Sequence, residues 1–452
     1  MYLFFLFLAL LFGGFARLYA VFRSPFPLND GALFYTMTSE LAANGFRLPE
    51  FSNFNGLHLP FAYPPLGFYL AGLLSHLGRW ELLDVFRVLP AVFTVLSIAA
   101  FYLLALDLLQ DKTRAGLASL IFAFLPAAYD WPIMGGGVTR APAFFFSLLA
   151  MHFIIRMYKG KRLRDVIPAA IFSALTVLSH PETALHTAAA ALVFFPFFGR
   201  NRRGLIQSML TAAGVLLLSS PWWLTVTLRH GFAPFTAAGK VGFSGFEWLF
   251  KLFTFDLSGE YYAQTIAVFA LVGLIILISR KQWLLPVLFL VIFISAPRSA
   301  ARSLSPVLAL AAGDALYLLL KSLNSRVHPS APAAQADNLL AGKLSRIVLG
   351  ILILQWVIST FTIGSILLKD RTLTAADRAA FSWASANTSA DSQFLILTGS
   401  NPLLDPVSEW FPTLSGRRSI ATLYGYEWKT GTDFREIHSE FSAVQDCSNR
   451  SA

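Results

Sequence analysis

The first polar stretch of the chain reads RSPFPLNDGALFYTMTSELAANGFRLPEFSNFNGLHLPFAYPP and covers residues 23–65. The segment before it, residues 1–22, is apolar and lacks the positive N-terminal region and small-residue cleavage site of a signal peptide, so we expect a retained membrane anchor. Asp30 then follows a first membrane helix and lies at the bilayer surface. There it can meet a lipid-borne molecule from the side and a polar one from water, which favours an enzyme over a channel.

The composition indicates an all-α polytopic membrane protein. Hydrophobic residues make up 56% of the chain and charged residues 13%, and the apolar residues come in runs of about twenty, the length a helix needs to cross the hydrocarbon. A β-barrel would show short alternating segments, and a soluble chain could not bury such runs. We expect about eleven spans, near residues 1–22, 87–109, 115–129, 138–157, 165–179, 183–198, 204–224, 261–279, 283–297, 303–320 and 347–367.

The net charge of +10 is explained by membrane orientation and requires no nucleic acid. Basic residues gather in alternate loops, which are therefore predicted to be cytoplasmic: Lys112 and Arg114, Lys159 to Arg164, Arg200 to Arg203, Arg280 and Lys281, and Lys321 to Arg346. The first loop and everything after residue 368 are then extracytoplasmic. Arg17 and Arg23, at the outer end of the first span, disagree with this rule. We expect the plasma membrane of a prokaryote.

The chain divides into a membrane domain, residues 1–367, and an extracytoplasmic soluble domain, residues 368–452. The membrane domain includes the outer loop 23–63 with interfacial helices and a cytoplasmic linker, residues 321–346. Residues 64–78 are apolar but short, so they are predicted to lie in the interface; a short tilted span is the alternative. In the second domain, a Thr374-x-x-Asp377 cap predicts a helix and residues 393–398 a strand, which together indicate a small α/β domain. Its polar last residues suggest that the domain is incomplete.

Asp30 is the strongest catalytic candidate, because a charged side chain at the edge of the hydrocarbon costs free energy and invites a functional reason. The alternative is structural: Asn-Asp before Gly-Ala-Leu-Phe-Tyr is also a helix N-cap pattern. The residues alone leave the two interpretations even.

The order of these motifs resembles the GT-C superfamily of integral membrane glycosyltransferases. The resemblance lies in the first span, the LNDGALFY and LAANG motifs of the first loop, YPPLGFYL from Tyr63, and RVLPA from Arg87. It implies that Asp30 is the catalytic carboxylate and that the donor sugar is carried by a polyprenyl phosphate. Many members carry a second acid directly after the first, where this chain has Gly31. The loop holds no Asp-x-Asp pattern, so no metal or other cofactor is predicted.

Further site candidates lie in the other outer loops. Asp130 falls where oligosaccharyltransferase-like members place a second acid, and Gly135-Gly136-Gly137 followed by Arg140 is suited to a phosphate. A flexible turn with a snorkelling arginine is the alternative. His180 and Glu182 form a tight outer turn, Arg298 and Arg302 are outside against the positive-inside bias, and Tyr63 closes the first loop. We expect these side chains to contact donor phosphate or substrate, with a plain turn and lipid headgroup contact as alternatives.

Two polar features have no assigned role. Asp314 lies inside a predicted span and needs a partner that the sequence does not identify. The segment from Glu409 to Arg418 mixes aromatic and basic residues, a combination suited to stacking on sugars or meeting phosphate. We interpret it as the more ordinary alternative, a domain core with a basic turn.

The sequence therefore predicts an inverting glycosyltransferase that moves a sugar from a polyprenyl-phosphate donor to an acceptor at the extracytoplasmic face, with Asp30 as general base. The partners expected are the donor, membrane lipids and an acceptor of unknown kind. A secondary transporter or lipid-sugar flippase is the alternative. It is disfavoured because we find neither repeated halves nor helices broken in mid-membrane.

Overall fold

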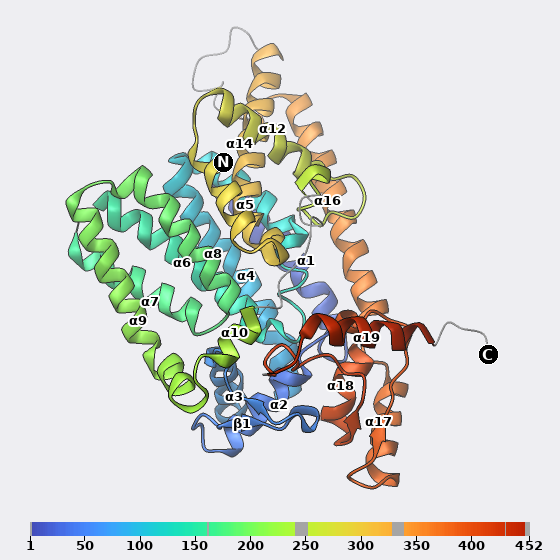
Figure 1. The fold of residues 1–452 in the computed structure, drawn as a ribbon. Coiled ribbons are helices and arrows are strands. Elements are labelled where there is room, and N and C mark those ends of the chain that lie inside the picture. The colour runs from blue at the N-terminus through green and yellow to red at the C-terminus, as the bar shows by residue number, and fades with distance from the viewer. Residues whose placement is uncertain (1, 161, 240–251, 328–338, 430, 448–452) are drawn as a thin grey trace.

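The computed structural model describes residues 2–160, 162–239, 252–327, 339–429 and 431–447. Most of the described chain is helical (Figure 1). The helices are α1 (Tyr2–Arg23), α2 (Ala32–Ala43), α3 (Leu66–Gly78), α4 (Leu82–Leu109), α5 (Lys112–Phe124), α6 (Gly137–Gly160), α7 (Val166–Val177), α8 (Pro181–Phe194), α9 (Arg202–His230), α10 (Ala233–Gly239), α12 (Thr265–Ser279), α13 (Leu284–Ser295), α14 (Ala300–Val327), α16 (Lys343–Asp370), α17 (Ala375–Asn387), α18 (Pro406–Ser415) and α19 (Phe434–Asp446). The strands β1 (Phe51–Ser52) and β2 (Leu59–Pro60) pair antiparallel, and β3 (Gln393–Phe394) and β4 (Arg418–Ser419) pair parallel.

Each of the eleven predicted spans falls on one of these helices. Within the described residues, seven helices are long and apolar enough to cross a membrane, those that begin at residues 2, 82, 137, 181, 202, 300 and 343. The predicted spans at α5, α7, α12 and α13 correspond to helices of 12 to 15 residues. The chain is therefore an all-α polytopic membrane protein. The segment predicted to be interfacial forms α3, an apolar helix of 13 residues.

Helix α5 lies at the centre of the membrane helices, with every residue from Ala115 to Phe124 buried. Small residues let its neighbours approach closely, as is usual between membrane helices. A Cβ atom added to Gly13 of α1 would stand 2.4 Å from the Cβ of Ala123, and one added to Gly313 of α14 would stand 2.7 Å from the Cβ of Ala118. The glycines thus allow α1 to approach α5 closely at Ala123, and α14 to approach it closely at Ala118.

Arg17 disagreed with the predicted orientation because it was taken as a charge at the membrane surface, and that placement is wrong. Its side chain is 0% exposed and points into the protein. The guanidinium donates to the carbonyl oxygens of Thr94, Phe122 (2.9 Å) and Ala123 (3.4 Å). Two of these carbonyls close α5, where helix oxygens lack internal donors and the helix dipole is negative. Arg17 is a structural cation inside the helix bundle.

Asp314, for which the sequence identified no partner, forms an ion pair with Arg114. The Arg114 Nη1 to Asp314 Oδ1 distance is 2.8 Å, and the carboxylate side chain is 4% exposed. The Arg114 guanidinium also lies over the ring of Tyr317, 4.5 Å from its centre. The pair joins α5 to α14 and offsets the cost of a charge within a membrane helix.

The first outer loop and the C-terminal segment lie together at one end of the molecule (Figure 1). They share a hydrophobic core in which Phe26 and Phe54 of the loop region pack with Phe381 and Trp410 of the C-terminal segment. The Asn55 side chain also binds the backbone of Ser419, donating to its oxygen and accepting from its nitrogen, both at 2.8 Å. The C-terminal segment is therefore one packed unit with the first loop.

The local structure of the C-terminal segment agrees with the sequence in part. Thr374 caps α17 in a capping box with Asp377, as predicted. The strand predicted at 393–398 is only two residues long and pairs with the equally short β4. Of the predicted linker, residues 328–338 lie outside the described residues, and α14 continues through Val327.

Candidate active site

A cavity of about 790 Å³ opens between the membrane helices, the first loop and the C-terminal segment. Seven of the predicted site residues line it: Asp30, Tyr63, Asp130, Arg140, His180, Glu182 and Arg302. These residues come from positions up to 272 apart in sequence (302 − 30), so folding alone brings them together. The eighth, Arg298, lies in a short helical turn, and its side chain is outside the described structure.

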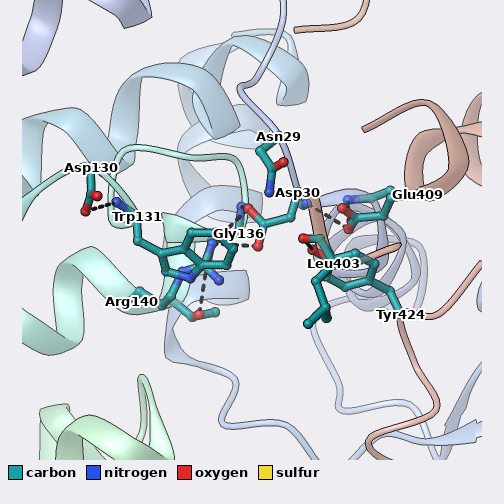
Figure 2. A network of polar contacts seen from close by, with 12 residues as sticks. Asn29, Asp30, Asp130, Trp131, Gly136, Arg140, Leu403, Glu409 and Tyr424 are labelled. Atoms are coloured by element: carbon teal, nitrogen blue, oxygen red, sulfur yellow. Dashed lines mark hydrogen bonds and ion pairs between the residues drawn. The ribbon is translucent and has the colours of Figure 1, made fainter. Parts of the chain in front are cut away.

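Asp30 and Arg140 form the central ion pair of the cavity (Figure 2). Nη2 of Arg140 lies 2.8 Å from Oδ1 and 2.6 Å from Oδ2 of Asp30, and both side chains are largely buried. The backbone nitrogen of Gly136 donates to Oδ1 at 3.1 Å. Asp30 does not cap α2, since the N-cap position is Gly31 and Asp30 instead points to Arg140.

The glycines at 135–137 explain how the carboxylate reaches this position. A Cβ atom on Gly136 would stand 2.6 Å from Oδ2 of Asp30, and one on Gly135 would stand 2.1 Å from the Asp30 backbone oxygen. Only glycine permits this approach, since a Cβ below 3.0 Å forces a shift. The sequence indicated an anion at this glycine loop, and in the structure that anion is the Asp30 carboxylate.

Glu409 is a carboxylate of the cavity that the sequence did not single out. It lies in α18, is 2% exposed and accepts hydrogen bonds from the backbone nitrogens of Gly31 (2.9 Å) and Ala32 (3.0 Å). Burial and the negative charge of Asp30 raise the pKa of Glu409 well above its usual value, while the two N–H donors and Arg140 act in the opposite direction. Our interpretation of residues 409–418 as a core and basic turn thus missed a residue of the cavity. The signal in the sequence that could have identified Glu409 is a carboxylate directly before two aromatic residues.

Asp130 lies on the wall of the cavity beside Trp131. The Trp131 backbone nitrogen donates to Oδ1 of Asp130 at 2.6 Å, and the Arg140 guanidinium lies 4.9 Å from the centre of the Trp131 ring. Burial raises the pKa of Asp130 to about 6, against the effects of that hydrogen bond and of the Arg302 charge. This carboxylate therefore changes charge close to neutral pH.

Arg302 supplies the second guanidinium of the cavity. Its side chain is 7% exposed, and within the described part of the chain its Nε and Nη2 atoms have no hydrogen-bond partner. Such unpaired charged groups are costly in a protein interior. An anionic ligand in the cavity would satisfy them.

The remaining predicted residues complete the walls. His180 caps α8, its Nδ1 accepting from the Thr183 backbone nitrogen at 3.3 Å. The Tyr63 hydroxyl contacts Thr139 Oγ1 at 3.2 Å, its ring lies 5.2 Å from that of Trp428, and burial raises its pKa. Trp428 belongs to the C-terminal segment, so that segment also lines the cavity.

Three helix N-termini meet at this cavity. Arg140 lies in the first turn of α6, Glu182 in the first turn of α8 and Arg302 in the first turn of α14. The positive end of the helix dipole favours an anion at each of these termini. The wall that carries Arg302 is thus built for negative charge. Among the described residues, no group of three or more His, Cys, Asp or Glu is arranged to hold a metal ion.

Comparison with known proteins gives matches in both sequence and structure. Residues 62–224 match the family described as dolichyl-phosphate-mannose-protein mannosyltransferase. A curated relative, dolichyl-phosphooligosaccharide-protein glycotransferase 1 of Archaeoglobus fulgidus, is 28% identical over 138 residues. This alignment covers 30% of the present chain and 23% of the relative, so the chain matches about a quarter of that protein's length.

Solved structures resemble nearly the whole chain. The Archaeoglobus fulgidus oligosaccharyltransferase tethered with an acceptor peptide has a TM-score of 0.66 at 14% identity and covers 99% of this chain and 68% of its own. ArnT from Cupriavidus metallidurans, bound to undecaprenyl phosphate, has a TM-score of 0.57 at 13% identity, and the match covers 98% of this chain and 88% of ArnT. The mycobacterial arabinofuranosyltransferase AftD has a TM-score of 0.54 at 15% identity, and the match covers 87% of this chain and 29% of AftD. At these identities the likeness establishes the fold.

Proposed function

We propose that this chain is a member of the GT-C superfamily of integral membrane glycosyltransferases and transfers a sugar from a polyprenyl-phosphate donor to an acceptor at the extracytoplasmic membrane face. Two similar structures support the choice of donor. ArnT was solved with undecaprenyl phosphate, and the Archaeoglobus fulgidus oligosaccharyltransferase was solved with an inhibitory peptide and a dolichol phosphate.

The observation that carries the proposal is the unpaired, buried guanidinium of Arg302 among three helix N-termini. The donor phosphate binds here, because Arg302 offers two donors without partners and the helix ends offer a favourable dipole. Arg140 is engaged by Asp30 but keeps an unpartnered Nε among the described residues, so it can also donate toward the phosphate. His180 and Glu182, on the same wall, contact the donor.

Asp30 acts as general base in this proposal. Its carboxylate accepts the proton of the acceptor hydroxyl while the hydroxyl oxygen attacks C1 of the sugar from the face opposite the phosphate. The bond between C1 and the phosphate oxygen breaks, the phosphate leaves with the electron pair, and the configuration at C1 inverts. Arg140 fixes the position of the base, and Arg302 offsets the charge that develops on the leaving phosphate.

The arrangement of the helices supports the proposed orientation. The N-terminal ends of α6, α8 and α14 face the cavity, whereas their far ends carry or precede basic residues such as Lys159, Arg200 and Lys321. Basic loops are retained in the cytoplasm, which supports our proposal that the cavity faces the opposite side. This alternation holds along the chain if α5, α7, α12 and α13 also cross, giving eleven crossings in all. We assign the protein to a prokaryotic plasma membrane.

Two experiments test the proposal. Mass spectrometry of lipids that co-purify with the protein is expected to find a polyprenyl phosphate or its sugar-linked form, and it identifies the donor. With that donor, Asp30→Asn should reduce sugar transfer by at least about a hundredfold, as expected for loss of a general base. Unchanged transfer at equal protein level would remove Asp30 from this role. Solute transport into liposomes without bond formation would favour a transporter instead.

A further inference from the structure

Helix α18 of the C-terminal segment holds the backbone on both sides of Asp30. Glu409 accepts from the nitrogens of Gly31 and Ala32, which follow the catalytic candidate. Trp410 Nε1 donates to the oxygen of Asn29, which precedes it, at 2.9 Å. Two adjacent side chains, 378 and 381 residues away in sequence, thus bind the three residues that flank Asp30.

The backbone here needs such support. Gly31 has φ +132°, which residues with a side chain rarely adopt, and Asn29 has φ +51°. The first amides of α2 have no capping side chain from their own N-cap residue, which is a glycine. The Glu409 carboxylate therefore caps α2 from another part of the chain, a role otherwise filled by a local Ser, Thr, Asp or Asn.

Further contacts fix the direction of α18 against this turn. Thr413, one helical turn after Glu409, donates to the oxygen of Ala32 at 3.3 Å and its hydroxyl lies 3.0 Å from that of Thr36. One face of α18 thus presents residues 409, 410 and 413 to the start of α2. A shift of α18 would move the Asp30 backbone with it.

We propose that Glu409 is a positioning residue for Asp30, so that the C-terminal segment completes the active site in the membrane domain. The Glu409 oxygen fixes the Asp30–Gly31 turn and thereby directs the Asp30 carboxylate to Arg140 and the cavity. Displacement of a reacting group by about 1 Å can cost about a hundredfold in rate, so loss of this contact affects turnover although Glu409 does not touch the substrate. This inference rests on the proposed function for its kinetic consequence.

To position Asp30, residue 409 must supply a hydrogen-bond acceptor, but it does not need a negative charge. The charged and titratable groups that face Glu409 are Asp30 from the loop, Arg140 from α6 and Tyr424 from the C-terminal segment. Burial and the Asp30 charge favour the protonated form of Glu409, whose carbonyl oxygen still accepts from the two amides. A glutamine at this position keeps that acceptor, and an alanine removes it.

Hydrogen–deuterium exchange of the full-length protein tests the contact without any substrate. Glu409→Ala is expected to speed exchange of the Gly31 and Ala32 amides about tenfold, the effect of losing a hydrogen bond to a buried acceptor. Glu409→Gln should exchange like the original protein. Asp377→Ala is the matched control, because Asp377 also caps a helix of the C-terminal segment but does not line the cavity.

Kinetics with the identified donor test the consequence. Glu409→Ala should lower kcat at least tenfold with KM for the donor within about threefold, because the Arg302 wall is untouched, and Glu409→Gln should recover most of kcat. Trp410→Phe, which removes only the donor to Asn29, should lower kcat in the same direction and serves if Glu409→Ala does not fold. Unchanged exchange at residues 31–32 in Glu409→Ala, or equal losses of kcat in the Ala and Gln variants, would overturn the inference. The exchange result is independent of whether Asp30→Asn abolishes transfer.

Discussion

Among the buried arginines of the membrane helices, Arg17 and Arg302 have guanidinium groups with opposite surroundings. Arg17 is 0% exposed and donates to three backbone carbonyls. Arg302 is 7% exposed, and two of its nitrogens have no partner among the described residues. Replacing each with methionine, which is flexible and fills irregular space, should therefore have opposite effects on stability and ligand binding.

Arg17→Met removes the hydrogen bonds from a charged donor to three buried carbonyl oxygens, and hydrogen bonds of this kind contribute about 1.5–3 kcal/mol each. The unfolding free energy should therefore fall by at least about 3 kcal/mol. Arg302→Met removes a charge whose desolvation is only partly offset, so stability should stay constant or rise by about 1 kcal/mol, the lower end of what is gained when buried ion pairs become apolar. Phosphate binding should weaken, since a hydrogen bond to a charged group contributes about 1.5–3 kcal/mol, or roughly 10–150-fold in Kd.

Both quantities can be measured on purified full-length protein in lipid nanodiscs. Thermal or denaturant unfolding reports stability, and titration with undecaprenyl phosphate reports Kd. At temperatures where it stays folded, Arg17→Met should bind the lipid phosphate with the original Kd. The reasoning fails if Arg302→Met is destabilised as much as Arg17→Met, which would mean that Arg302 has a structural partner, or if its Kd is unchanged, which would place the phosphate elsewhere.

Three other substitutions probe separate parts of the structure. Asp314→Asn should destabilise by about 1–3 kcal/mol, because it leaves a half-buried Arg114 guanidinium unpaired, and Arg114→Gln in the same chain should restore part of the loss in an unfolding assay. Affinity for undecaprenyl phosphate should fall as pH rises through about 6, because Asp130 becomes ionised beside Arg302. Asp130→Asn should remove this pH dependence of the affinity and leave only the pH dependence that comes from ionisation of the lipid phosphate. Gly31→Asp should reduce the yield of folded protein, since a Cβ there lies 2.8 Å from the Gly135 backbone.

The apolar pattern predicted the helices well because crossing a membrane requires a continuous run that any window detects. It located their ends less well where a helix leaves the hydrocarbon. Helix α4 begins at Leu82 instead of near residue 87. Its first turn carries Asp84, which forms an ion pair with Arg87, and a hydropathy pattern predicts such a charged turn as a loop. Helix α9 likewise continues past the predicted end at 224 and finishes with Arg229 and His230, which are suited to water.

The contacts of the candidate site could be predicted only in part. Asp30 and Arg302 could be predicted as site residues from their local sequence, because a charged residue beside a membrane span is unusual. The pairing of Arg140 with Asp30 and the capping of α2 by Glu409 join segments 110 and 378 residues apart. No periodicity links such positions, and a capping glutamate from another domain has no sequence pattern of its own.

The charges of the cavity also limit how it can bind a phosphate. Within the described residues, the lining contains six carboxyl groups, those of Asp30, Asp130, Glu182, Asp256, Glu409 and Glu427, and two guanidinium groups, those of Arg140 and Arg302. If all were ionised, this excess of negative charge would repel an anion. Raised pKa values for Asp130 and Glu409 reduce it, and the Asp30–Arg140 pair cancels internally. In the proposed function, anion binding then depends on Arg302 and the three helix N-termini. The acidic walls are left for sugar and acceptor hydroxyls, which carboxylates bind as hydrogen-bond acceptors.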